Sequence, residues 1–144
     1  MPNFPTRDRL RQLLLRQEMG ILGLNQTDQG ILLISAAITI PAGTTFTEKE
    51  ITERLQRWLS TVGTNLSDDA VEIRRYLVDF KLLLRDPAGR AYTRSANWPD
   101  KWKEIAAELQ SVNIEEFAEE VRTEEIERRA ARKKAAMDKR QQSL

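Results

Sequence analysis

The sequence predicts a mainly α-helical protein with one small β-hairpin. Apolar residues recur at helical spacing in several segments, and Thr47-Glu48-Lys49-Glu50 forms a capping box, which marks the start of a helix. The stretch EIRRYLVDFKLLLRDPAGRAYTR, residues 72–94, then runs from an amphipathic helix into two short strands joined by a turn. The expected order is therefore helix, strand, two helices and hairpin. This is a winged helix-turn-helix-like core, and we expect helical extensions at both of its ends.

Composition bounds the class of protein. A length of 144 residues suits one domain with extensions, and a chain with 40% hydrophobic and 31% charged residues suits a soluble fold. The formal net charge is 23 − 22 = +1, so the whole chain has no strong field that would attract nucleic acid or a membrane. Any electrostatic contact must therefore depend on where the charges lie.

The residue types argue against an enzyme. The chain has no Cys and no His, which removes thiolate nucleophiles, disulfides, the usual zinc sites and the commonest general base. The Asp and Glu residues are interpreted as helix caps, dipole partners or solvated side chains, so no cofactor or metal is expected. The longest apolar-rich run, residues 31–42, is shorter than the roughly 20 residues that span a bilayer. The N-terminus lacks a signal-peptide core, and we expect a cytoplasmic protein without a membrane partner.

The N-terminal extension, residues 1–26, is expected to hold a helix over 6–19. Thr6 is its candidate cap, and a stripe of Leu10, Leu13 and Leu14 lies on one face. We favour packing of this stripe on the core of the same chain. A dimerisation helix, and hence a homodimer, stays open, whereas a basic DNA-binding arm is less favoured.

The core domain is expected over residues 27–95. Thr27 or Asp28 is the candidate cap of a buried helix, which Pro41-Ala42-Gly43 ends, and a short strand follows at residues 44–46. The capping box then begins a helix over 47–63. Its inward face is formed by Ile51, Leu55, Trp58 and Leu59.

The second helix of the core is predicted over residues 68–83. Ser67 is its candidate cap, with Asp68 and Asp69 at the positive end of the helix dipole. The strands of the hairpin follow, joined by Asp86-Pro87-Ala88-Gly89, whose residue types suit a type I turn.

The C-terminal segment divides into two parts. Residues 96–127 are expected to form helices that pack on or beside the core, and residues 128–144 a basic tail that frays into solvent. Residues 115–127 carry seven Glu and one Arg, and residues 128–140 carry seven Lys or Arg and one Asp, which gives −6 followed by +6. This order follows the helix dipole and predicts the ion pairs Glu124–Arg128 and Glu125–Arg129.

Residues 46–94 resemble the bacterial family called domain of unknown function 2087. The likeness lies in FTEKEITERL, residues 46–55, and IRRYLVDFKLLLRDPAGRAYTR, residues 73–94. Members of this family occur alone or attached to helix-turn-helix transcriptional regulators, so the resemblance implies a winged-helix architecture and a link to transcription. This chain departs from the family pattern in a longer link at residues 61–71 and in Tyr76, where an acidic residue is common.

A DNA-binding winged helix places the helix before the hairpin in the major groove. The candidate nucleic-acid contacts are therefore the following cations on that helix and the hairpin: Arg74, Lys81, Arg85, Arg90 and Arg94. Residues 67–81 nevertheless sum to −1. We expect Arg75 to pair with Glu72 or Asp79, which leaves Arg74 the freer of the two. The Arg-Arg pair is interpreted foremost as an anchor between helix and hairpin.

Two functions follow as hypotheses. The first is a transcription-related, DNA-associated protein of low sequence specificity, because the hairpin, residues 85–94, carries +2 and can contact phosphates. The alternative is a protein–protein interaction module that uses the charged C-terminal helix as a docking arm. The winged-helix fold serves both roles and does not decide between them. The basic tail is most simply explained as a counterweight to the Glu block and the dipole.

Overall fold

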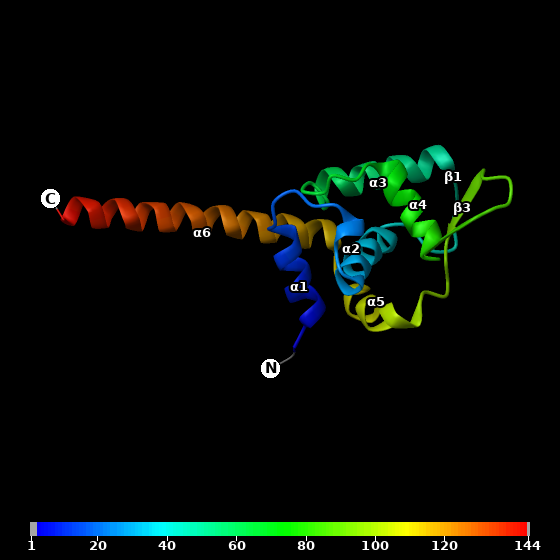
Figure 1. Ribbon diagram of the computed structural model, residues 1–144, viewed down its shortest axis with the longest axis horizontal. Coiled ribbons are helices and arrows are strands. Elements are labelled where there is room, and N and C mark those ends of the chain that lie inside the picture. Colours follow the sequence, from blue (N-terminus) through cyan, green and yellow to red (C-terminus); the bar gives the residue numbers. More distant parts are fainter. Residues whose placement is uncertain (1–2, 144) are drawn as a thin grey trace.

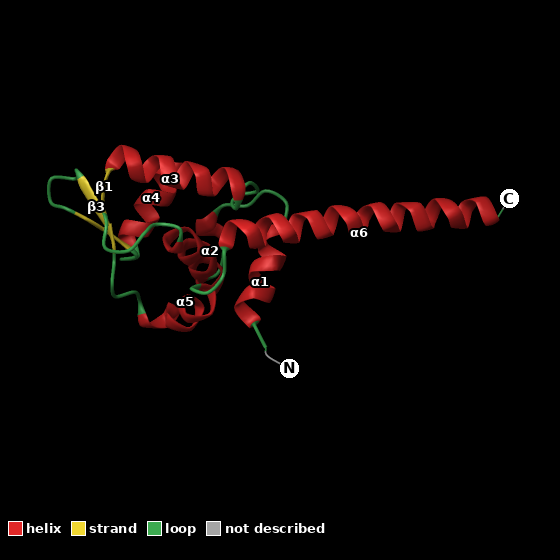
Figure 2. Ribbon diagram, turned by 180° about the vertical axis from the view of Figure 1, so that it is seen from behind, coloured by secondary structure: helices red, strands yellow, loops and turns green. Residues whose placement is uncertain are grey.

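The protein is mainly α-helical with a small antiparallel sheet, as predicted. The computed structural model describes residues 3–143, which form six α-helices, two short 3₁₀ turns and three strands (Figure 2). The elements are α1 (Pro5–Leu14), η1 (Ile21–Gly23), α2 (Gln26–Ile38), β1 (Thr45–Thr47), α3 (Glu48–Thr61), α4 (Ala70–Asp79), β2 (Leu83–Arg85), β3 (Ala91–Arg94), η2 (Asp100–Trp102), α5 (Lys103–Leu109) and α6 (Ile114–Gln142). The order helix, strand, two helices and hairpin is the predicted one.

The three strands form one sheet in the order β1-β3-β2. The first strand pairs with the hairpin through Phe46 opposite Tyr92, and both of these side chains are buried. Leu84 lies opposite Thr93 in the other pair of strands. The sheet therefore lies at one end of the body, with α3 and α4 beside it (Figure 1).

The core is built around α2, whose residues 30–37 are all buried. Helices α1, α4 and α5 pack against it. The leucine stripe of α1 is buried within this chain, with Leu10 and Leu13 at 0% exposure. The same cluster includes Leu77 of α4 and Leu109 of α5, so the N- and C-terminal segments share one core with the central domain.

The cap of helix α2 lies two residues before Thr27 and three before Asp28, the two predicted caps. Asn25 is the cap, because its side-chain oxygen accepts from the Asp28 N–H at 2.8 Å. The Asp28 carboxylate is instead held by Arg9 of α1, with Nε to Oδ1 at 2.9 Å and Nη2 to Oδ2 at 2.8 Å. These hydrogen bonds lower the pKa of Asp28 despite its burial, and they fix α1 to the first turn of α2.

Helix α4 is capped by Asp69 rather than by Ser67. Asp69 and Glu72 form a capping box, with the two side-chain-to-backbone bonds at 2.8 and 3.1 Å. Ser67 is engaged elsewhere, since its N–H donates to the Met19 carbonyl at 2.9 Å. Met19 also forms a parallel bridge with Leu66, which is why α1 ends at Leu14 rather than near residue 19.

Helix α6 differs from the expected frayed tail. It begins after the Asn113 cap and continues to Gln142, although residues 126–143 are exposed (Figure 1). The packed first turns already supply the helix nucleus, and the later residues are dominated by Ala, Arg, Lys and Gln, which favour helix. Leu144 lies outside the described residues. Within residues 3–143, none of the helices has the length and apolar character needed to cross a bilayer.

Candidate nucleic-acid interface

The hairpin turn exposes Arg85 and Arg90. The Gly89 N–H donates to the Asp86 carbonyl at 2.9 Å, and Gly89 has a φ of +71°, so this position favours glycine. The Asp86 carboxylate accepts from the backbone N–H groups of Ala91 at 3.2 Å and Arg90 at 2.7 Å, which lowers its pKa. The Asp86 carboxylate therefore stabilises the turn and does not pair with either arginine. Among residues 3–143, neither guanidinium has an ion-pair partner within 4 Å.

Lys81 lies directly after α4 in a left-handed backbone conformation, with a φ of +64°. Its N–H donates to the Val78 carbonyl at 3.1 Å, and the Leu82 N–H donates to the Leu77 carbonyl at 2.9 Å. These two bonds define a Schellman motif, whose turning position is usually glycine. The Lys81 side chain is exposed, so this residue adds a third accessible cation before the hairpin.

Arg74 is not accessible, and the expectation that it is the freer of the two arginines is wrong. Its side chain is 16% exposed and pairs with Glu48 at 3.1 Å. It also donates to the Thr52 hydroxyl at 2.8 Å, and its guanidinium lies 5.7 Å from the centroid of the Tyr92 ring. Arg74 therefore joins α4 to α3 and to the sheet.

Arg75 is the accessible member of the pair. It is exposed on α4, and it makes no ion pair within 4 Å to any described residue. Neither expected partner, Glu72 or Asp79, pairs with it, and Glu72 closes the capping box with the Asp69 N–H. The sequence contained a signal for this role of Glu72, because a Glu three residues after an Asp cap can form a capping box and is then not free to pair with an arginine.

Arg94 is also part of the fold rather than of the exposed charge. Its Nη1 donates to the Ile40 carbonyl at 3.2 Å, and its guanidinium lies 4.9 Å from the centroid of the Trp98 ring. Burial lowers the pKa of Arg94. The residue connects the end of β3 to the loop after α2. Of the five predicted contacts, Lys81, Arg85 and Arg90 are exposed, and Arg74 and Arg94 are engaged.

The N-terminus of α4 is bound to another part of the chain. The Asp68 carboxylate accepts from the Ile21 N–H at 2.9 Å and from the Tyr76 hydroxyl at 3.3 Å. In helix-turn-helix complexes this end of the helix faces the base edges. Here it carries two carboxylates and lies beside η1. The long link before α4 therefore holds the N-terminal segment, and the α4 N-terminus is not presented as a free end.

The exposed face of α4 is poor in cations. Val71, Arg75 and Asp79 follow one another at four-residue spacing and are all exposed. Its charges cancel, with one Arg and one Asp. This face offers one cation to a phosphate and no cluster of cations, in contrast to the hairpin.

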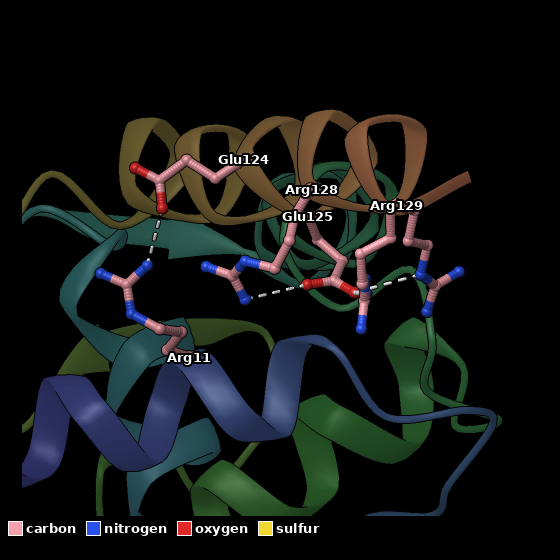
Figure 3. Close-up of polar contacts among 6 residues, drawn as sticks. Arg11, Glu124, Glu125, Arg128 and Arg129 are labelled. Carbon is pink, nitrogen blue, oxygen red and sulfur yellow. Dashed lines mark hydrogen bonds and ion pairs between the residues drawn. The ribbon is translucent and has the colours of Figure 1, made fainter. Parts of the chain in front are cut away.

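A second group of cations lies on α6, at the other end of the molecule. Glu125 accepts from three arginines of its own helix, at 3.3 Å from Arg128, 3.1 Å from Arg129 and 3.4 Å from Arg132 (Figure 3). The predicted pair Glu125–Arg129 is therefore confirmed. The predicted pair Glu124–Arg128 is wrong, because Glu124 binds Arg11 of α1 at 3.0 Å. This partner is 113 residues away in the sequence and leaves no local signal.

The direction of α6 is fixed by a half-buried arginine. Arg122 donates to the carbonyls of Thr61 at 3.0 Å and Val62 at 2.6 Å, and to the Asn65 side chain at 3.3 Å. Its cation thus lies at the C-terminus of α3, where the helix dipole favours positive charge. Burial lowers the pKa of Arg122. These bonds anchor the first half of α6 before the helix leaves the body.

A small hollow of about 180 Å³ lies between α3 and α6, lined in part by Arg57, Trp58 and Glu115. Arg57 is already paired with Glu115 at 3.1 Å. The Trp58 indole N–H is buried and has no hydrogen-bond partner among residues 3–143. Within the described part of the chain, no group of three or more acidic residues is placed to hold a metal ion. These features define no small-molecule site.

The fold and these surfaces define a small helical domain with a hairpin and two exposed cationic regions. Residues 24–94 match the model of the family described as "Uncharacterized protein conserved in bacteria (DUF2087)", and this part of the chain belongs to that family. The match begins before residue 46, so it includes the buried helix α2 and ends with β3. The chain has no match among curated proteins or among solved structures.

Proposed function

We propose that this protein associates with DNA in a transcription-related role, through phosphate contacts of low sequence specificity. The observation that carries the proposal is the set of exposed cations at the sheet end, Lys81, Arg85 and Arg90, which have no ion-pair partner among residues 3–143. The order of elements and the strand order β1-β3-β2 support a winged-helix interpretation, in which such a hairpin lies against the DNA backbone.

Low specificity follows from α4. Reading base edges requires polar side chains on a helix that enters the major groove, whereas phosphate contacts carry no sequence information. The N-terminus of α4 is bound to Ile21 through Asp68, and its exposed face offers Arg75 as a single cation. The accessible charge of this region is therefore suited to the backbone of any duplex.

The test is fluorescence anisotropy of a labelled mixed-sequence duplex, titrated with protein at several salt concentrations. The double variant Arg85→Ala/Arg90→Ala should bind all duplexes more weakly. The slope of log affinity against log salt should become shallower by about 1.8, since each phosphate contact contributes about 0.9. The matched control, Arg16→Ala/Lys49→Ala, removes two exposed cations elsewhere and should keep the wild-type slope.

The outcomes separate the hypotheses. Wild-type binding by the Arg85/Arg90 variant would remove the hairpin as the contact. Absence of binding by the wild-type chain at low salt, where weak charge contacts are strongest, would reject DNA association altogether.

A protein-interaction module is the second candidate. It is favoured by the bond between Asp68 and Ile21, because a helix with a bound N-terminus is a poor reader of DNA. The long α6, which extends from the body, would then be the docking arm (Figure 1). This function becomes the working proposal if the duplex titration shows no binding.

A further inference from the structure

The second half of α6 projects from the body as a single helix. We call residues 126–143 the arm. All of its residues are exposed, and among residues 3–143 its side chains make hydrogen bonds and ion pairs only within α6 (Figure 1). The helix is anchored before the arm by the buried residues Ile114, Ala118 and Val121. The arm therefore has a fixed origin and no packing partner in the described chain.

The cations of the arm are sorted onto one face. Arg128, Arg132 and Lys139 follow at spacings that keep them on one row of a helix. A neighbouring row, at the same spacings, consists of Arg129, Lys133 and Arg140. At roughly 100° per residue these six cations lie within about 140° of arc. We call this surface the basic face.

The opposite side of the arm has a different composition. Glu127, Lys134 and Asp138 fall together there, so the two acids of the arm are kept away from the basic face. The sum on the basic face is +6, and the sum on the opposite side is −1. Such separation is not required for a solvated helix.

Helix stability does not account for the basic face. The helix dipole acts within the last turn, and only Lys139 and Arg140 lie in the last turn of α6. Glu125 is shared by Arg128, Arg129 and Arg132, so this group of four keeps a net charge of +2. The earlier explanation, that the tail balances the Glu block, is therefore incomplete.

The other acids of α6 are engaged or distant from the basic face. Glu124 binds Arg11, and Glu115 binds Arg57. Glu116, Glu119 and Glu120 line an exposed groove on the first half of the helix. Lys133, Lys139 and Arg140 thus have no ion-pair partner among residues 3–143.

We propose that the basic face is a second binding site for the phosphate backbone of duplex nucleic acid. The face is about 18 Å long at a rise of 1.5 Å per residue, and it presents two parallel rows of cations. The inference deepens the proposed function, because it adds a contact that lies apart from the hairpin. Its chemistry is sequence-independent, as only phosphates are contacted.

A second copy of the chain fits the basic face less well. Two α6 helices that pack antiparallel are related by two-fold symmetry. The basic face of one helix would therefore lie next to the basic face of the other. The exposed acids Glu116, Glu120 and Glu127 lie on the side opposite to the basic face, so they would not meet the partner's cations. A lipid surface is also a poor fit. Helices at membrane interfaces carry large apolar residues on one face, and the arm has only Ile126 and Met137 of this kind.

The test is the double variant Lys133→Gln/Arg140→Gln, which removes two cations from one row of the basic face. The control Lys49→Gln/Lys134→Gln removes the same charge from outside it. Both chains are titrated into a labelled mixed-sequence duplex of 20 base pairs by anisotropy. Between 50 and 200 mM salt, wild-type binding should weaken about 12-fold more than that of the basic-face variant, as expected for two lost phosphate contacts at about 0.9 each.

Each outcome is informative. Equal slopes for the wild type and the basic-face variant, or equal losses in the variant and its control, would overturn the proposal. If the basic-face variant still binds the duplex and the Arg85/Arg90 variant does not, the hairpin alone is the binding site. If the Arg85/Arg90 variant still binds and the basic-face variant does not, the arm alone is the binding site. The wild type could instead prefer vesicles of phosphatidylserine and phosphatidylcholine over the duplex. If the basic-face variant loses this preference, the ligand of the basic face is a lipid surface and not a duplex. Circular dichroism checks that Gln, a good helix former, keeps the helix content of the wild type.

Discussion

At the scale of single residues, Lys81 combines an exposed cation with an unfavourable backbone. It occupies the turning position of the Schellman motif after α4 with a φ of +64°. A side chain in this conformation costs about 1–2 kcal/mol, which glycine avoids. The chain thus keeps a lysine where glycine would stabilise the helix end.

Replacement of Lys81 by glycine should therefore raise the free energy of unfolding. The relief of the left-handed conformation is partly offset by the greater backbone entropy of glycine in the unfolded state, about 0.5–1 kcal/mol, so the expected gain is about 0.5–1 kcal/mol. Urea denaturation measures it. Lys81→Ala is the control, because it removes the same charge but keeps a Cβ. An equal gain in both variants would assign the effect to charge instead.

The two neighbouring arginines of α4 show what local sequence can and cannot predict. The pairing of Arg75 with Glu72 is plausible from spacing, yet Glu72 completes the cap with Asp69. The partners of Arg74, Thr52 and Glu48, come from α3 and are more than 20 residues away. Helix caps are local, and the cap at Thr47 was predicted correctly, whereas partners from other elements left no local signal. The exposed arginines of the hairpin were therefore among the predicted contacts, whereas on α4 the engaged Arg74 was predicted in place of the exposed Arg75.

At the scale of elements, the contact between α2 and the segment before α5 depends on a missing side chain. Gly30 lies in the middle of α2, and a Cβ built there would lie 2.4 Å from Nε1 of Trp102 and 2.6 Å from its Cδ1. Trp102 is 1% exposed, and its indole N–H donates to the Gln26 carbonyl at 3.2 Å. The ring thus packs directly on the helix backbone, which leaves it little room to move.

The substitution Gly30→Ala should lower the free energy of unfolding by about 1–3 kcal/mol, the usual range for overpacking. Helix propensity alone predicts the opposite sign, because alanine is favoured over glycine by about 1 kcal/mol in a helix. Thermal and urea denaturation decide between the two. Gly23→Ala is the control, since a Cβ at Gly23 has no neighbour within 4 Å and the stability should stay close to that of the wild type. A more stable Gly30→Ala variant would mean that Trp102 shifts without cost.

The periodicity of apolar residues predicted which segments are helices. It did not predict where the helices end, because contacts between distant segments decide this. The buried character of α2 and the inward faces of α3 and α4 were readable from spacing. The end of α1 was not, because Met19 pairs with Leu66 of the distant link. The persistence of α6 was missed for another reason. Apolar spacing ends near Ile126, whereas the helix continues on propensity from an anchored first half.

At the scale of the whole molecule, the two cationic regions lie at opposite ends. The hairpin is at one end of the longest axis and the C-terminus of the arm is at the other, in both views (Figure 1, Figure 2). The net charge of +1 conceals this distribution, because acids on the first half of α6 cancel the arm. A duplex shorter than the long axis of the molecule contacts one region at a time, since the helical body separates the hairpin from the arm (Figure 1).

A chain that uses both regions should therefore join two duplexes. The test is capture of a fluorescent duplex by beads that carry a second, biotinylated duplex. The wild-type chain should retain the fluorescent duplex. The Arg85→Ala/Arg90→Ala and Lys133→Gln/Arg140→Gln variants should each still bind one duplex, because each keeps one region, and should lose the capture.

Dimerisation is the competing explanation for such capture, because two copies with one site each would also join two duplexes. Sedimentation of the protein, at the protein concentration of the capture experiment, distinguishes a dimer from a single chain with two sites. Joining of two duplexes by single chains requires a monomer of 16.6 kDa. The dependence on variants adds a second criterion. In a dimer that binds through the hairpin alone, the arm variant would keep its capture. Loss of capture in both variants, with a monomeric wild type, is the result that the positions of the hairpin and the arm predict.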